Sequence, residues 1–266
     1  MKEKHPPLRF VPTVIVPVYN HPDTIETVVQ RIRQQQFPVI VVNDGSNQKT
    51  REACDRCQAL GATVVHRQTN GGKGAAMMTG FRVALKQGAT HALQIDADGQ
   101  HDLSQVRVFL ALSAKFPNDL ICGYPHYDQS VPKARLWGRK LTNFWVCVNA
   151  LSLAPADAMC GLRVYPLAAV QQLLVRHSVG RRMDFDPEIL VRLMWMGVRV
   201  KNLPVDVTYP TDGISHFNTL TDNIRISWMH TRLCLTKLLC LPFILSSRWT
   251  GWQPRQPTPP TERKLH

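Results

Sequence analysis

The chain has 266 residues, of which 44% are hydrophobic and 19% charged, so it can bury the core of one sizeable domain. Its 32 Lys and Arg against 19 Asp and Glu give a formal net charge of +13, which favours an anionic partner such as a nucleotide, a lipid phosphate or a nucleic acid. The seven cysteines lack disulfide-framework spacing and no apolar leader follows Met1, which argues against secretion and indicates reduced thiols.

Short β-rich runs alternate with amphipathic helical patterns over the first half of the chain. Strands are predicted at Thr13–Val18, Val39–Asn43, Thr63–His66, His91–Ile95 and Leu120–Tyr124, and helices at Thr24–Gln36, Lys49–Leu60, Lys73–Gln87 and Leu103–Phe116. This alternation predicts an α/β fold, with a mainly parallel sheet covered by helices on both faces. Ligands of such sheets bind at the carboxyl ends of the strands.

The rhythm changes after about residue 125. Helices are predicted at Ala134–Leu151, Ala168–Val175 and Pro187–Met196, a turn and strand at Met159–Arg163, a strand pair at Val198–Val207, and a last helix from near Leu220. The proposed divisions are an N-terminal arm at 1–10, a catalytic domain at 11–217, amphipathic helices at 218–250 and a Pro-rich, disordered tail at 251–266.

No run reaches the roughly 18 to 20 apolar residues that a membrane span requires. The longest, Leu233–Leu245, is interrupted by Lys237 and Pro242. From Arg225 to the C-terminus, however, cations and the tryptophans Trp228, Trp249 and Trp252 flank this apolar run, and such a mixture suits the headgroup layer of an anionic membrane. A helix packed on the catalytic domain is the equal alternative.

Polar clusters follow three of the predicted strands, at Pro17–Asn20, Asn43–Ser46 and Asp96–Gln100. Each alone is most often an ordinary turn rich in Asn, Asp and Gly. Because the carboxyl ends of parallel strands share one edge of the sheet, the three clusters together predict a single ligand crevice.

Two features of this crevice point to a diphosphate. Asp96 and Asp98 are spaced to approach one hard cation, although a lone D-x-D arises often by chance. The turn at 71–74, Gly-Gly-Lys-Gly, precedes a helix and can present Lys73 and main-chain amides to phosphate, but its spacing is not that of a P-loop.

Four motifs occur in order: Val14–Asn20, Val42–Ser46, Asn70–Gly74 and Asp96–His101. Together they resemble the family-2 glycosyltransferases of the GT-A fold, particularly the dolichyl- and polyprenyl-phosphate sugar synthases. The resemblance extends from about Val11 to His216 and implies an inverting transfer of a sugar from a nucleoside-diphosphate sugar to a lipid or lipid-linked acceptor.

The resemblance also implies roles for individual residues. The nucleotide-sugar is expected at Pro17, Tyr19, Asn20, Asp44, Lys73 and Asp96, and a Mg²⁺ or Mn²⁺ ion at Asp98 with support from Gln100. Asp157, in a segment similar to the family's D-x-x-S-G-F-R, is the expected catalytic base for a hydroxyl acceptor, and Glu188 is expected to orient that hydroxyl. An acceptor that is already an ionised phosphate needs less from either carboxylate.

The acceptor or its phosphate is expected at Arg135, Arg139, Lys140, Arg163 and His216, although a solvated basic helix face is an equal alternative for the first three. The family commonly has Gly-Ser-Arg after the fifth strand, whereas this chain has Gly123-Tyr124-Pro125, which weakens the prediction of a polyprenyl phosphate.

We therefore predict a metal-assisted enzyme that is peripherally bound to the cytosolic face of a membrane. A nucleotidyltransferase is the nearest alternative, but the loop after its first strand is usually Gly-rich and the one here has no glycine. A basic nucleic-acid-binding protein is the other, and no nucleic-acid-binding motif supports it.

Overall fold

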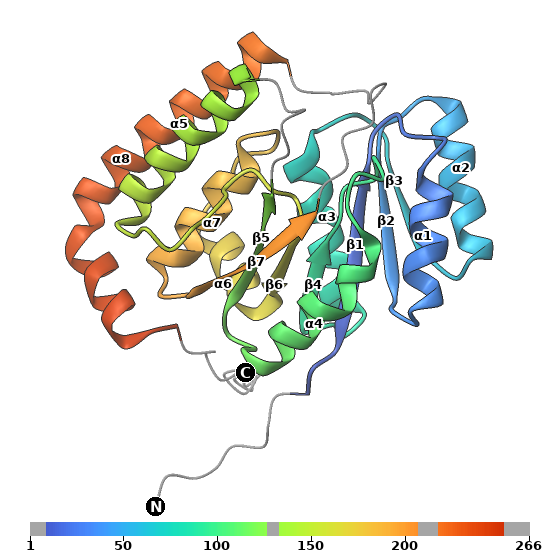
Figure 1. Cartoon of the computed structure of the whole chain (residues 1–266), viewed down its shortest axis with the longest axis horizontal. Helices are drawn as coiled ribbons and strands as arrows, with labels where there is room; N and C mark the ends of the chain where they lie inside the picture. Colours follow the sequence, from blue (N-terminus) through green and yellow to red (C-terminus); the bar gives the residue numbers. More distant parts are fainter. Residues whose placement is uncertain (1–8, 127–132, 207–217, 253–266) are drawn as a thin grey trace, which may run out of the picture.

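The computed structural model describes residues 9–126, 133–206 and 218–252. Within these ranges one sheet has the strand order β3-β2-β1-β4-β6-β5-β7 (Figure 1). Its strands are β1 (Pro12–Val18), β2 (Val39–Asp44), β3 (Thr63–Arg67), β4 (His91–Gln94), β5 (Leu120–His126), β6 (Arg163–Pro166) and β7 (Val200–Asp206). The helices are α1 (Ile25–Gln34), α2 (Gln48–Ala59), α3 (Lys73–Lys86), the 3₁₀ turn η1 (Leu103–Gln105), α4 (Val106–Lys115), α5 (Lys133–Ala150), α6 (Leu167–Arg176), α7 (Phe185–Trp195) and α8 (Thr219–Thr250).

The sheet is mainly parallel, as predicted. β1 pairs in parallel with β2 and β4, β2 with β3, and β5 with β7, while β6 runs antiparallel to both β4 and β5. The strand pair predicted over Val198–Val207 is wrong. That segment contains one strand, β7, because its main chain pairs with β5 rather than with itself.

Helices cover both faces of the sheet and produce two hydrophobic cores. Alternation along β1 sends Ile15 into the core shared with α3, α5, α6, α7 and α8, and Val14 and Val16 into the core shared with α1, α2 and α4. Cys54 and Cys57 of α2 lie in the second core, where burial raises the pKa of Cys54 to about 12 and that of Cys57 to about 11. Buried, protonated thiols of this kind are chemically inert residues of the core.

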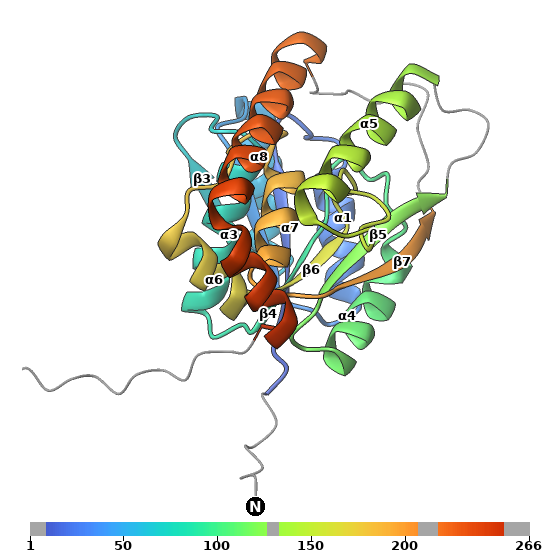
Figure 2. The same ribbon diagram turned by 90° about the vertical axis from the view of Figure 1, so that its left-hand side faces the viewer.

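α8 packs along α5 and α7 at the edge of the molecule that lies away from α1 and α2 (Figures 1 and 2). It begins after Asn218, whose side-chain oxygen accepts a hydrogen bond from the Thr221 amide (3.1 Å). Lys237 Nζ donates to the Val148 carbonyl (3.0 Å) and Arg248 Nη1 to the Ala150 carbonyl (2.9 Å). These bonds satisfy the last carbonyl groups of α5, which have no partner within their own helix.

By length and composition, α8 is a candidate membrane span, which corrects the prediction that no segment qualifies. These two properties do not separate a spanning helix from one that packs on a domain. Here one face of α8 is already buried against the domain, through Ile226, Met229, Leu233 and Ile244. We therefore describe α8 as a helix of the domain surface.

His230 lies in the interface between α8 and α5. The Asn149 side-chain amide donates to its Nδ1 (3.2 Å), and burial lowers its pKa from 6.5 to about 4. The folded state therefore takes up this proton less readily than the unfolded state. The contribution of neutral His230 to the free energy of unfolding is therefore fully present above about pH 6.5, and it is lost as the pH falls toward and through the folded-state pKa.

We predict that protonation of His230 lowers the free energy of unfolding by about 2 to 3 kcal/mol as the pH falls from 6.5 to 4. Urea denaturation of the wild type and of His230→Gln across this range measures it, because glutamine keeps an acceptor for Asn149 but does not titrate. A variant profile as steep as that of the wild type would contradict the assignment to His230.

Candidate active site

The three polar loops predicted to form one crevice do meet at the carboxyl ends of β1, β2 and β4. The Asn20 amide donates to Ser46 Oγ (3.1 Å), and the Asn47 amide donates to Asn20 Oδ1 (3.0 Å). Thr24 Oγ1 donates to the Ala97 carbonyl (2.5 Å), which ties the loop after β4 to the start of α1. Hydrogen bonds thus hold the loops of three strands together at one edge of the sheet.

Asp44, the last residue of β2, organises the glycine-rich turn that precedes α3. Its side chain is buried, and Oδ1 accepts from Arg67 Nε (2.6 Å) and the Gly71 amide (3.1 Å), while Oδ2 accepts from the Gly72 amide (2.7 Å). Gly72 has a φ of +92°, which a residue with a side chain rarely adopts. The shape of the turn therefore depends on Asp44, and a contact with a nucleoside base stays a prediction.

Arg67 was not predicted as a site residue. It ends β3 and lies in parallel register with Asp44, so strand pairing would have revealed the ion pair once the order β3-β2 was known. Its Nη1 also donates to the Ala75 carbonyl (3.2 Å) and to Thr79 Oγ1 (2.9 Å), both on α3. Arg67 thus joins the end of β2 to the start of α3.

Lys73 is the central cation of the site. Its Nζ lies 2.9 Å from an oxygen of Asp96 and 2.9 Å from an oxygen of Asp186. Burial alone would lower the pKa of Lys73, but the two carboxylates raise it above its ordinary value, so the ammonium stays charged. Burial would raise the pKa of Asp96, yet Lys73 and His101 hold it below its usual range.

Asp186 is a further site residue that sequence reasoning did not select. It lies in the first turn of α7, and its Oδ1 accepts a hydrogen bond from Gln94 Nε2 (3.2 Å) at the end of β4. The Tyr165 hydroxyl in turn donates to Gln94 Oε1 (3.1 Å). Asp186 therefore reaches Lys73 from the half of the chain that follows the predicted donor motifs.

Asp98 and Gln100 lie in the loop after β4, where a metal ion was predicted. The Gln100 amide donates to Asp98 Oδ1 (3.0 Å), and burial, followed by the nearby charge of Asp96, raises the pKa of Asp98. Unlike Asp96, Asp98 forms no ion pair with a lysine or arginine of the described ranges. Such a carboxylate suits Mg²⁺ or Mn²⁺, which take one or two protein oxygens and complete their shell with phosphate and water. Within residues 9–126, 133–206 and 218–252, no three His, Cys, Asp or Glu side chains gather to hold a metal alone.

Asp157 forms a pair with Arg139 of α5. Arg139 Nη2 lies 3.1 Å from Oδ1 and Nε 3.2 Å from Oδ2 of the carboxylate, and the Met159 and Cys160 amides also donate to Oδ1 (2.6 and 2.8 Å). The structure thus brings together two of the predicted residues, one expected as the base and one expected at the acceptor. With both oxygens engaged, Asp157 is arranged to hold Arg139 rather than to take a proton.

Two other predicted roles need correction. Arg163 is 0% exposed, and its guanidinium donates to the carbonyls of Cys160, Ala158 and Asp186, which leaves no surface for an acceptor. Glu188 is also 0% exposed, and both of its oxygens are bonded inside the protein, so it cannot orient a hydroxyl in the crevice. Both are structural in this fold.

The remaining predicted residues are placed as follows. Pro17 and Tyr19, both half-buried, lie at the end of β1 beside Asn20. Lys140 is exposed on α5, where its Nζ lies 5.6 Å from the Trp137 ring centre. The side chain of Arg135 and all of His216 lie outside the described residues.

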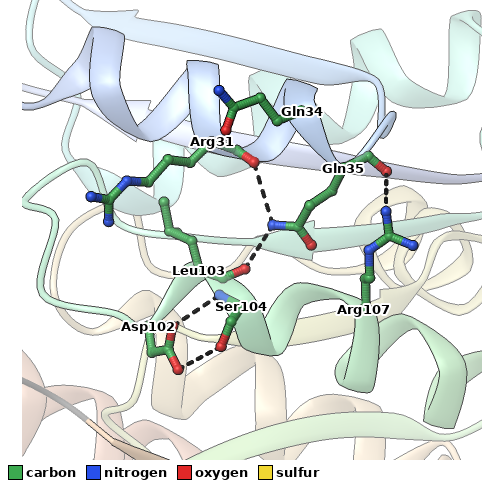
Figure 3. Close-up of a pocket in the computed structure, with 7 residues that line it drawn as sticks. All are labelled: Arg31, Gln34, Gln35, Asp102, Leu103, Ser104 and Arg107. Carbon is green, nitrogen blue, oxygen red and sulfur yellow. Dashed lines mark hydrogen bonds between the residues drawn. The ribbon is translucent and has the colours of Figure 1, made fainter.

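A pocket of about 510 Å³ opens elsewhere, between the end of α1 and the η1–α4 segment (Figure 3). It is lined by Arg31, Gln34, Gln35, Asp102, Leu103, Ser104 and Arg107. Hydrogen bonds cross it from one helix to the other: Gln35 Nε2 donates to the Leu103 carbonyl (2.9 Å), and Arg107 Nη2 donates to the Gln35 carbonyl (3.4 Å). None of the predicted site residues lines this pocket, and we do not assign it to catalysis.

Comparison with known proteins gives a consistent result. Residues 13–165 match the model of glycosyl transferase family 2. The chain is 26% identical over 202 residues to an undecaprenyl-phosphate mannosyltransferase of Micrococcus luteus, covering 72% of this chain and 81% of that protein. It is 25% identical over 221 residues to a polyprenol monophosphomannose synthase of Mycolicibacterium smegmatis, covering 80% and 82%. The crystal structure of a mycobacterial protein shares the fold with a TM-score of 0.61 at 15% identity, covering 90% of this chain and 75% of that one.

We predict that Asp44→Asn lowers the free energy of unfolding by about 3 kcal/mol, because it leaves the half-buried Arg67 without its ion partner and weakens the glycine turn. Asp55→Asn is the matched control. It removes a carboxylate that is exposed on α2 beside His66, and should cost under about 1 kcal/mol. Urea denaturation compares the two, and equal losses would contradict the structural role of Asp44.

Proposed function

The chain belongs to glycosyl transferase family 2, and from this we propose that it moves a sugar from a nucleoside diphosphate to the phosphate of a polyprenyl or dolichyl lipid. Membership of the family decides against the nucleotidyltransferase alternative. Support for the acceptor comes from two relatives that are named for polyprenyl phosphate substrates. The observation that carries the donor site is Lys73, held at the carboxyl edge of the sheet beside Asp96 and the Asp98 loop.

The donor would bind across the loops of β1, β2 and β4. Pro17, Tyr19 and Asn20 form one wall for the nucleoside, and Asp44 lies behind the glycine turn. The N-terminus of α3 and the Lys73 ammonium supply positive charge for the diphosphate. Asp98 and Gln100 are the residues that would hold Mg²⁺ or Mn²⁺, which would neutralise charge on the departing diphosphate.

In the proposed reaction, an oxygen of the acceptor phosphate attacks the anomeric carbon from the side opposite the diphosphate. The new carbon–oxygen bond forms as the bond to the diphosphate breaks, and the diphosphate leaves with that electron pair. One displacement of this kind inverts the anomeric configuration.

A phosphate acceptor fits the carboxylates better than a hydroxyl acceptor does. A hydroxyl needs a base within hydrogen-bond reach, but the oxygens of Asp157 and Glu188 are engaged by arginines and main-chain amides. An ionised phosphate has no proton to lose. We assign Arg139, oriented by Asp157, as a cation for this phosphate, which offsets the absence of the family's Gly-Ser-Arg.

Two neighbouring helices supply the surface for membrane contact. Large apolar side chains are exposed on α5 at Trp137, Leu141, Phe144 and Trp145, and on α8 at Trp228, Leu235, Leu238, Leu239, Phe243 and Trp249. Exposed stripes of this kind suit the boundary between headgroups and acyl chains, and we place the enzyme on the cytosolic face. Trp252, also expected there, is buried, and its Nε1 donates to Gln172 of α6 (3.1 Å).

Charge contributes less to this contact than the net +13 implies. Lys237 and Arg248 bond to carbonyls of α5, and Arg225 pairs with Asp222 on its own helix (3.0 Å). Apolar insertion is therefore the main contribution that the described part of α8 can make.

We predict that one of the nucleotides UDP, GDP, CMP and ADP, added with Mn²⁺ at a nucleotide concentration of 100 times its Kd, raises the free energy of unfolding of the wild type by about 2.7 kcal/mol. Asp98→Ala should remove the Mn²⁺-dependent part of this shift. Asp102→Ala is the control, since Asp102 is exposed and only caps η1. Thermal denaturation reports the shifts, and a full Mn²⁺-dependent shift in Asp98→Ala would contradict the metal assignment.

We also predict that the double variant Leu239→Ser, Trp249→Ser binds anionic phospholipid vesicles at least about tenfold more weakly. Both side chains are exposed on α8, and burying an apolar side chain of this size in the bilayer contributes about 1.5 to 3 kcal/mol to the free energy of binding. Val175→Ser changes an apolar residue that is 80% exposed on α6 and should leave binding unchanged. Vesicle co-sedimentation measures both, and equal binding by the double variant and the wild type would exclude the α8 face.

A further inference from the structure

Glu188 joins three parts of the structure. It is 0% exposed in α7, and its Oε1 accepts from Arg192 Nε (2.8 Å) one turn later. Its Oε2 accepts from the Gly180 amide (2.8 Å) and from Arg232 Nη2 of α8 (2.7 Å). A buried carboxylate needs such partners, because an unpaired charge in the core is costly. One oxygen atom thus links α8 to the segment that precedes α7.

That segment, residues 180–182, lies directly on the glycine turn of the donor site. The Ala75 amide donates to the Arg181 carbonyl (3.0 Å), and Arg182 Nη1 donates to Asn70 Oδ1 (3.1 Å). A β-carbon on Gly74 would lie 2.6 Å from the Gly180 carbonyl oxygen, so the two chains are in close contact. A displacement of residues 180–182 must therefore displace the turn that carries Lys73.

Arg232 is held mainly by this carboxylate. Its side chain is 41% exposed, and its Nε is buried with no hydrogen-bond partner in the described ranges. Without Arg232, Glu188 would keep Arg192 and the Gly180 amide. The link between α8 and residues 180–182 can therefore be cut from the α8 side without leaving a buried charge unpaired.

We propose that Arg232 and Glu188 are positioning residues that set the donor turn from α8, so that nucleotide affinity depends on how this helix is seated. The inference rests on the proposed function, in which the 71–74 turn binds the diphosphate and α8 contacts the membrane. Neither side chain touches the substrate. Their action passes from α8 through the Gly180 amide to the main chain at Ala75.

The test measures the Kd of the full-length protein for each of UDP, GDP, CMP and ADP with Mn²⁺, by calorimetry. Arg232→Gln should weaken binding of the recognised nucleotide about tenfold, within the usual range for coupling between sites. Arg232→Lys, which can still reach Glu188, should recover part of the loss. Arg225→Gln is the matched control, because this arginine of α8 pairs with Asp222 of the same helix.

Hydrogen exchange separates positioning from a general loss of stability. In Arg232→Gln the amides of Gly180 and Gly72 should exchange faster, while the melting temperature stays near that of Arg225→Gln. A wild-type Kd together with unchanged exchange in Arg232→Gln would overturn the inference and leave the proposed function intact. No nucleotide binding by the wild type would overturn the proposed function and this inference with it.

Discussion

A largely buried lysine ammonium, bound by two carboxylates, holds the site together. Lys73 begins α3, Asp96 follows β4, and Asp186 lies in the first turn of α7, so this one cation joins the donor half of the sheet to the second half of the chain. The two carboxylates keep the Lys73 ammonium charged in spite of its burial, and the ammonium in turn favours the ionised form of Asp96. These contacts also fix the position of the loop that carries Asp98, because that loop continues directly from Asp96.

A second set of contacts fixes the main chain around this centre. Asp44 holds the glycine turn through hydrogen bonds from the Gly71 and Gly72 amides and also binds Arg67. Residues 180–182, which precede α7, contact the turn on another side. The Asp157–Arg139 pair anchors α5, the helix beside α8, to the loop before β6. The donor site and the exposed apolar helices are thus parts of one bonded network, which suits an enzyme that meets a soluble donor and a lipid acceptor.

Local patterns were sufficient to predict much of this arrangement. The alternating periods located the strands and helices of the first half to within a few residues, and turn chemistry placed the loops at Asn20, Asp44 and Asp98 along one edge of the sheet. Long-range pairing was not predictable in this way. Asp186 and Glu188 are two residues apart, about 200° around the axis of α7, so only tertiary packing decides which of them faces Lys73. Likewise, the sequence does not show that Trp252 turns inward onto α6 while Trp249 stays exposed.

The most direct test of the account is a transfer assay with purified protein, Mn²⁺, polyprenyl phosphate and a panel of radiolabelled nucleoside-diphosphate sugars. We expect one donor to give a labelled lipid in the organic phase, with the anomeric configuration opposite to that of the donor. A dephosphorylated polyprenol should accept no sugar, because the oxygens of Asp157 and Glu188 are already engaged by arginines and main-chain amides and cannot take the proton of a hydroxyl. Equal transfer to the alcohol, or no transfer from any donor to the phosphate, would contradict the central claim.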